Sequence, residues 1–517
     1  MIRPILTVSA GTLTSRLLGF VRDALVAALL GAGGVADAFL LAFQLVNVTR
    51  RLLTEGALNA ALVPAWLRLR DLNGPAVAAA FAGRLVGSIG VATLAMAILL
   101  GVAMPLVIAA LAPGFVGQPT LQRAVDDARL MLPYLAFAGP VAVMMGLLNA
   151  QHRFALTAFS PLLFNLALIG TTIALLIWRR DAAEAALILA ATVGVAGLLQ
   201  LLTLAWRRGD AVATPLRLAF DAEMRGFLGR ALPGMLANSG PQWLIVAGAV
   251  IASAVPAAVS WLYFANRLIE LPLGIVGTAM GTVLVPELTR AVRADDPAAI
   301  AQAESRALEL AVGLALPAML GLVVLSQPIV RLLFEHGAFG AADTAATAQA
   351  LALLALGLPA QVLTKALAPA FFARDNTGSP LRAMLGGLGV AIVAALLLAP
   401  WFGIGGVAAA VALGAWGSAA LLIRRGAATF GLSLTADARR RLVLIAIAAL
   451  AMAGLLWLKA TFALPLVAQA HSAIQAAALL LVIAGAVAIY GGLLVLLGVV
   501  SPSELLRAIR RPAGLHD

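Results

Sequence analysis

Long apolar stretches, separated by short polar and basic segments, follow one another along the whole 517-residue chain. An α-helix needs about 20 consecutive apolar residues to cross a bilayer, and these stretches approach or exceed that length. The pattern predicts about fourteen membrane-spanning helices. The predicted spans are residues 5–30, 35–54, 78–111, 130–150, 160–178, 183–206, 232–253, 257–285, 307–326, 345–372, 381–400, 404–423, 442–458 and 473–499.

The composition supports an all-α polytopic membrane protein. Hydrophobic residues make up 62% of the chain and charged residues 11%, whereas a soluble domain carries about 25% charge. No polar stretch is long enough to form a soluble domain. The chain has no cysteine and only four scattered histidines, so the sequence predicts no disulfide, no metal site and no cofactor.

The basic residues indicate the orientation. With the N-terminus in the cytoplasm, 25 of the 35 lysines and arginines fall in cytoplasmic segments, six in external loops and four within spans. Such an excess on one side predicts that both termini are cytoplasmic. The net charge of +12 then reflects membrane topology, and no nucleic-acid partner is expected.

Two similar motifs indicate an internal repeat. Residues 149–154 precede Ser160-Pro161 in the fifth span, and residues 370–375 precede Ser379-Pro380 in the eleventh. A separation of six helices favours two six-helix lobes in parallel orientation, and transporters built from repeats bind their substrates between them. The predicted parts are an N-terminal lobe at 1–215, a C-terminal lobe at 216–430, and two additional helices with a cytoplasmic tail at 431–517.

The first predicted span contains charged residues near its centre: Arg16, Arg22 and Asp23. An arginine at the centre of a membrane helix costs about 2.5–3.5 kcal/mol, so these residues indicate a polar cavity. Arg16 and Asp23 share a helical face, while Arg22 points about 120° away unless the helix bends near Gly19. The alternative is a scaffolding ion pair hidden from lipid, for instance Arg22 with Asp37.

Further polar residues lie on the second, eighth and tenth spans. The second span has a helically spaced polar stripe, and the flanking Arg50 is either a cavity residue or a membrane anchor. The eighth span carries Arg267 and Glu270 on one face, and Lys365 of the tenth either faces the cavity or snorkels to the surface. The residues of the stripe are Asp37, Gln44, Asn47, Arg51, Glu55 and Asn59.

The balance of these charges favours an anionic substrate. Five arginines of the candidate cavity face four carboxylates, and arginine recognises phosphate through two parallel hydrogen bonds. We therefore predict a substrate-binding cluster of four arginines with a supporting network of charges. The cluster is Arg16, Arg22, Arg50 and Arg267, and the network is Asp23, Asp37, Arg51, Glu55, Glu270 and Lys365.

These residues also carry a family resemblance. The stretch Ser15-Arg16-x-x-Gly19-Phe20-x-Arg22-Asp23 and the motif Trp261-x-Tyr263-x-x-x-Arg267-x-x-Glu270-x-Pro272 closely resemble the MurJ/MviN family of lipid II flippases. This family belongs to the multidrug/oligosaccharidyl-lipid/polysaccharide exporter superfamily. The chain departs from some members at Gln44 and Asn266, where they have lysine and aspartate.

The resemblance implies a function in cell-wall synthesis. Members move the undecaprenyl-pyrophosphate-linked peptidoglycan precursor, lipid II, across the bacterial inner membrane by alternating access. It implies that the four arginines bind pyrophosphate and that the last two helices provide a groove for the lipid tail. Lipid II and membrane lipids are then the expected partners, other cell-wall synthesis proteins are candidate partners, and the chain is expected to act as a monomer.

Three other functions are consistent with a polytopic chain. One is a flippase for another polyprenyl-linked oligosaccharide, or a multidrug exporter; the N-terminal arginine motif argues against both. An enzyme acting on the same lipid would need acid and base groups beside the membrane, and the external loops offer few. A scaffold alone does not explain the intramembrane arginines. We therefore predict a transporter, not an enzyme.

Overall fold

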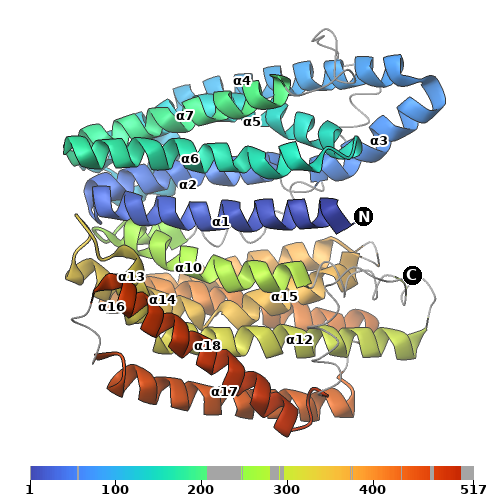
Figure 1. The fold of residues 1–517 in the computed structure, drawn as a ribbon, viewed down its shortest axis with the longest axis vertical. Helices are drawn as coiled ribbons and strands as arrows, with labels where there is room; N and C mark the ends of the chain where they lie inside the picture. Colours follow the sequence, from blue (N-terminus) through green and yellow to red (C-terminus); the bar gives the residue numbers. More distant parts are fainter. Residues whose placement is uncertain are drawn as a thin grey trace. The chain divides into compact units, whose positions relative to one another are not determined.

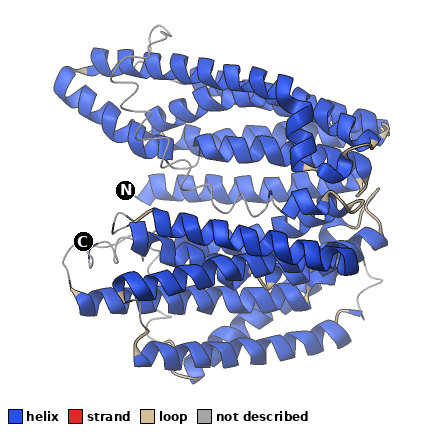
Figure 2. Cartoon of the chain, turned by 180° about the vertical axis from the view of Figure 1, so that it is seen from behind, coloured by secondary structure: helices blue, strands red, loops and turns tan. Residues whose placement is uncertain are grey.

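The computed structural model describes residues 2–54, 57–206, 246, 248–279, 290, 296–372, 374, 376–431, 434–465 and 471–501. Within these ranges the regular elements are α-helices and one short 3₁₀ helix, η1 (Pro113–Phe115) (Figure 2). The predicted all-α class is confirmed. The predicted span 232–253 lies mostly outside the described residues.

The chain forms two compact units. The first comprises Met1–Gln242 together with two short segments from later in the chain, Ser253–Ser260 and His336–Phe339. In it α5 packs against α2, α4 and α7, and α1 packs against α6 (Figure 1). Its helices are α1 (Ile2–Leu30), α2 (Gly34–Thr54), α3 (Ala57–Asn73), α4 (Pro75–Leu111), α5 (Pro119–Ala150), α6 (Phe154–Trp178) and α7 (Ala182–Trp206).

The second unit comprises Trp243–Ala252, Trp261–Glu335 and Gly340–Asp517. In it α12 packs against α15 and α17, and α17 packs against α18. Helix α10 begins in the first unit and continues into the second after Ser260. The helices are α10 (Ala258–Ala279), α12 (Pro297–Val324), α13 (Ser326–Phe334), α14 (Ala341–Ala355), α15 (Leu358–Phe372), α16 (Gly378–Phe430), α17 (Ala436–Phe462) and α18 (Ser472–Leu496).

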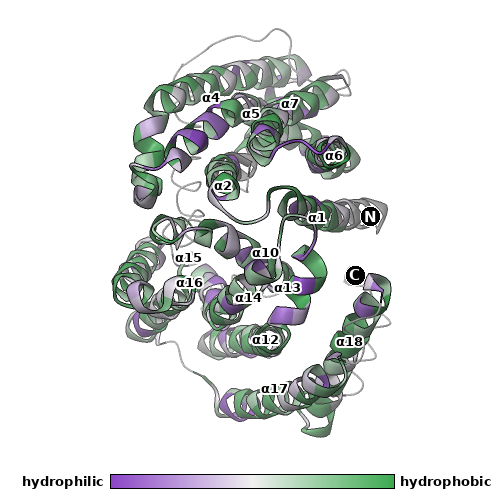
Figure 3. Ribbon diagram, turned by 90° about the vertical axis from the view of Figure 1, so that its left-hand side faces the viewer, coloured by the Kyte–Doolittle hydropathy of each residue, from purple (hydrophilic) through white to green (hydrophobic). Residues whose placement is uncertain are grey.

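The described helices are those of a multi-span membrane protein. Eight of them are long and apolar enough to cross a bilayer, and a ninth span results if α14 and α15, bent by 41° at their junction, are counted together. Apolar residues cover most of these helices (Figure 3). Exposed tryptophans at helix ends, Trp178, Trp401 and Trp457, are typical of a membrane–water boundary. The full count of fourteen stays a prediction.

Two local breaks set the helix boundaries. Gly403 has φ of 53° inside α16, a left-handed conformation that glycine adopts without strain, and it divides the element into two helices. This break agrees with the separate spans predicted at 381–400 and 404–423. In the second predicted span α2 ends at Thr54, so Asn59 lies on the next helix, α3, and Glu55 lies outside the described residues.

Candidate functional site

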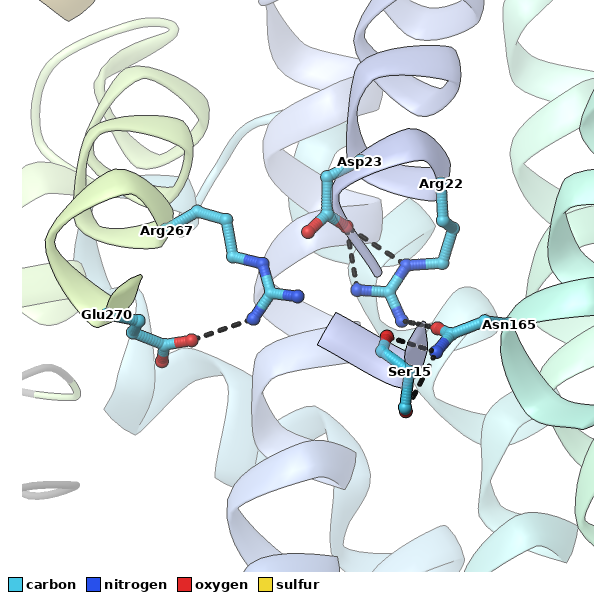
Figure 4. Close-up of polar contacts among 6 residues, drawn as sticks. All are labelled: Ser15, Arg22, Asp23, Asn165, Arg267 and Glu270. Atoms are coloured by element: carbon cyan, nitrogen blue, oxygen red, sulfur yellow. Dashed lines mark hydrogen bonds and ion pairs between the residues drawn. The ribbon is translucent and has the colours of Figure 1, made fainter. Parts of the chain in front are cut away.

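The guanidinium of Arg22 is held by two buried side chains, Asp23 and Asn165. Its Nε and Nη2 donate to Asp23 Oδ1 at 2.9 and 2.7 Å, and its Nη1 donates to Asn165 Oδ1 at 3.0 Å (Figure 4). The side chains of Arg22 and Asp23 are only 9% and 3% exposed. A buried arginine is stable only with a counter-charge and hydrogen-bond acceptors, and Asp23 and Asn165 supply both.

Asn165, on α6, is a site residue that the sequence analysis missed. Its Oδ1 accepts from Arg22, and its Nδ2 donates to the backbone carbonyl of Ser15 at 3.1 Å. One amide therefore binds α1 at two positions, two helical turns apart. A lone asparagine on an apolar helix gives no pattern in sequence, and only the packing of α6 on α1 shows its role.

Aromatic side chains complete the surroundings of Arg22. Its Cζ lies 4.9 Å from the ring centroid of Phe43 on α2 and 5.9 Å from that of Phe164 on α6. Phe164 also packs against Tyr134 of α5, with ring centroids 5.2 Å apart. Cations are attracted to ring faces, more strongly in a desolvated site. Arg22 is thus surrounded by residues from α1, α2 and α6.

Arg50, another predicted cavity residue, belongs to the same neighbourhood. It lies on α2 two helical turns after Phe43, on the same face of the helix. Arg16 is half-buried on α1, two helical turns before Asp23. The first unit therefore carries Arg16, Arg22, Asp23 and Arg50, and their role in substrate binding stays a prediction.

Arg22 does not pair with Asp37, the example given for the scaffolding alternative. Arg22 pairs instead with its chain neighbour Asp23, at 2.7 Å. Asp37 instead accepts hydrogen bonds from the backbone N and the hydroxyl of Ser260, at 2.8 and 2.5 Å. This carboxylate holds the first turn of α10.

The second unit contains a separate ion pair. Arg267 Nη1 lies 2.8 Å from Glu270 Oε2, one helical turn further along α10 (Figure 4). The two side chains are 19% and 25% exposed. This pairing agrees with the face predicted for the eighth span. Lys365 is half-buried on α15, while the side chain of Arg51 lies outside the described residues.

The acidic residues of the predicted external loops make local contacts. Arg180 pairs with Glu184 at 2.9 Å, Arg331 with Glu335 at 3.7 Å, and Asp181 accepts from the N–H of Ala183 at 3.1 Å. These are helix-end and helix-surface interactions. Among the described residues no group of three or more histidine or acidic side chains could hold a metal ion.

The comparisons with known proteins agree with this architecture. Residues 26–497 match the family model described as lipid II flippase MurJ. The chain is 36% identical to a probable lipid II flippase MurJ of Rhizobium meliloti, over 99% of this chain and 97% of that protein. It is 32% identical to a lipid II flippase MurJ of Burkholderia cenocepacia, over 80% of this chain and 81% of that protein.

Solved structures show the same fold. A lipid II flippase MurJ in an inward closed conformation superposes with a TM-score of 0.77 at 22% identity, covering 98% of this chain and all of that one. An inward-facing multidrug resistance transporter of the MATE family has a TM-score of 0.64 at 14% identity, covering 86% of this chain and 98% of that one. The match of the family model and the full-length relative show that the chain belongs to the lipid II flippase MurJ family.

Proposed function

We propose that this protein moves lipid II from the inner to the outer leaflet of the bacterial inner membrane. Membership of the flippase family over nearly the whole chain is the observation that carries the proposal. The proposed orientation has both termini in the cytoplasm, because the basic residues are concentrated on that side. The flippase is a transporter, and its chemistry is binding and release without covalent change.

The proposed ligand of the arginine cluster is the pyrophosphate of the lipid. A guanidinium carries five N–H donors, and three of those of Arg22 are used by Asp23 and Asn165. Two remain for phosphate oxygens, in an orientation fixed before the substrate arrives. Preorganised donors bind a ligand without the cost of ordering them. We propose that Arg16, Arg50 and Arg267 supply the further positive charge.

Transport by alternating access requires two conformations of similar free energy. The acidic partners suit this requirement, because Asp23 and Glu270 neutralise Arg22 and Arg267 when no substrate is bound. A cavity with unpaired positive charge would bind pyrophosphate too tightly to release it. The proposed roles of Asp37, Glu55, Arg51 and Lys365 are to complete this balance of charge.

The test is depletion of the native protein with complementation by Arg16→Ala or Arg267→Ala. These variants are expected to insert into the membrane at the normal level and to leave lipid II in the inner leaflet. The measurement is the fraction of lipid II that an externally added probe can reach. Arg180→Ala is the matched control, because it removes an exposed ion pair with Glu184 away from the proposed cluster. Normal export by the two cluster variants would refute the arginine cluster.

A further inference from the structure

Two short segments of the later chain are bound to the first unit through close backbone contacts. The segment Ser253–Ser260 is held by Asp37, which accepts from Ser260, and by Gly114, whose N–H donates to the hydroxyl of Ser253 at 3.1 Å. A Cβ on Gly114 would lie 2.2 Å from the carbonyl oxygen of Ser253. The contact therefore requires glycine at position 114.

The segment His336–Phe339 is bound in a similar way. The N–H of Ala338 donates to the carbonyl of Ala28 on α1 at 2.8 Å. Gly337 has φ of 59°, and a Cβ there would lie 2.3 Å from the same carbonyl oxygen. Gly31, with φ of 65°, approaches the carbonyl of Ala338 so closely that a Cβ would lie 2.6 Å from it. Any side chain at Gly337 should release this segment.

One carboxylate, that of Asp343 in the second unit, accepts hydrogen bonds from the two residues that directly follow the segments. Asp343, half-buried at the start of α14, accepts from the indole Nε1 of Trp261 at 3.0 Å through Oδ1. Through Oδ2 it accepts from the backbone N of Gly340, also at 3.0 Å. Trp261 directly follows the first segment and Gly340 directly follows the second.

We propose that Asp343 is a positioning residue that couples the two segments, so that they bind to and leave the first unit together. The two hydrogen bonds tie the first turn of α10 to the N-terminus of α14. If one segment is displaced, the donor that follows it, Trp261 or Gly340, moves with it. Because both donors bind the same carboxylate, the other segment is then displaced as well. The cap alone needs only the bond to Gly340; the bond to Trp261 serves the coupling. The proposal does not depend on which substrate is moved.

Among the described hydrogen bonds, none joins Asp343 or Trp261 to an arginine of the predicted cluster. Their effect on transport therefore acts through the conformational change. Two states that differ in both segments at once interconvert in a single step, whereas uncoupled segments would populate partly released states. Coupling of this kind makes the conformational equilibrium all-or-none.

The test measures release of one segment while the other is disturbed. The chain has no cysteine, so Val259→Cys, at a buried position of the first segment, gives a single thiol whose labelling rate in purified protein reports release. Gly337→Ala disturbs the second segment. With Asp343 present, Gly337→Ala is expected to raise the labelling rate by at least about fivefold, the lower end of typical coupling between sites.

The same comparison is then made with Asp343→Ala and separately with Trp261→Phe, which keeps the ring and loses only the donor. In both backgrounds Gly337→Ala is expected to change the labelling rate by less than about twofold, because the coupling free energy is lost. Trp261→Phe carries the test even if Asp343→Ala folds poorly. Asp296→Ala is the matched control: it removes the carboxylate that caps α12, and it should leave the fivefold effect intact.

Two results would overturn the proposal. One is an equal effect of Gly337→Ala on labelling whether or not Asp343 and Trp261 are intact. The other is no effect of Gly337→Ala in the otherwise native protein.

Discussion

Arg22 and Arg267 are both arginines on membrane helices with an acidic partner, yet the protein holds them differently. Arg22 is bound by Asp23, by Asn165 and by two aromatic rings, so three helices fix it. Arg267 is paired with Glu270 on its own helix, and the pair is more exposed. Arg22 is therefore positioned by tertiary packing, and Arg267 by the spacing of residues along one helix.

The largest expected effect is a difference in unfolding free energy between variants of the two ion pairs. Asp23→Ala leaves a buried guanidinium without its counter-charge and is expected to cost about 3–5 kcal/mol of unfolding free energy. Glu270→Ala, in the more exposed pair, is expected to cost about 1 kcal/mol or less. The measurement is a denaturant titration of purified protein in detergent. Equal losses for the two variants would contradict the comparison.

Asn165 gives the next largest effect. Asn165→Ala removes the acceptor of Arg22 Nη1 and the donor to Ser15, and hydrogen bonds to charged groups are worth about 1.5–3 kcal/mol. Transport should fall as well, because the guanidinium loses its fixed orientation. The same titration gives the stability, and the reach of an external probe for lipid II gives the transport. Thr172→Ala is a control with a buried polar side chain of the same helix, whose hydroxyl donates to the carbonyl of Leu168 at 2.7 Å. It should lose stability without a selective loss of transport.

The aromatic surroundings should contribute least among the contacts of Arg22. Phe43→Leu keeps an apolar side chain and removes the ring that lies 4.9 Å from the guanidinium. A desolvated cation–π contact is worth up to about 2 kcal/mol, and we expect a loss of about 1 kcal/mol with partial transport. Phe81→Leu, in the apolar cluster near Trp66, is the control for the change in packing alone. A Phe43 variant that behaves like this control would exclude a role for the ring in holding Arg22.

The double variant Arg22→Met/Asp23→Leu should cost less stability than Asp23→Ala, about 1–3 kcal/mol, because only the buried Oδ1 of Asn165 is left without its donor. Replacing a buried ion pair by apolar residues of similar volume is often neutral or stabilising, because the cost of desolvating the charges disappears. The double variant should therefore unfold at a midpoint closer to the native one than that of Asp23→Ala. An unfolding free energy as low as that of Asp23→Ala would show that the pair is required for the fold itself.

Much of this architecture follows from apolar periodicity. The boundaries of α1 and α7 agree with the predicted spans to within three residues, α6 ends where predicted, and Gly403 lies in the predicted gap between two spans. Helix spacing also gave the Arg267–Glu270 pair, because residues three apart face each other on one helix. Interactions between residues close in the sequence can be predicted from their spacing along one helix.

The partners of Arg22 and Asp37 could not be predicted in the same way. Asn165 and Ser260 are separated from them by 143 and 223 residues, and the contacts depend on how the helices pack. The sequence offers Asp37 as a partner of Arg22 only as one example of a scaffolding ion pair. The structure assigns Asp37 to the first turn of α10 instead. The direct role of the four arginines in binding stays a prediction.

The most direct test of the central claim is lipid II export by the Arg22→Met/Asp23→Leu variant in cells depleted of the native protein. The account predicts a protein that inserts and folds normally while lipid II stays in the inner leaflet. Export at the native rate by this stable variant would contradict the claim that Arg22 binds the pyrophosphate.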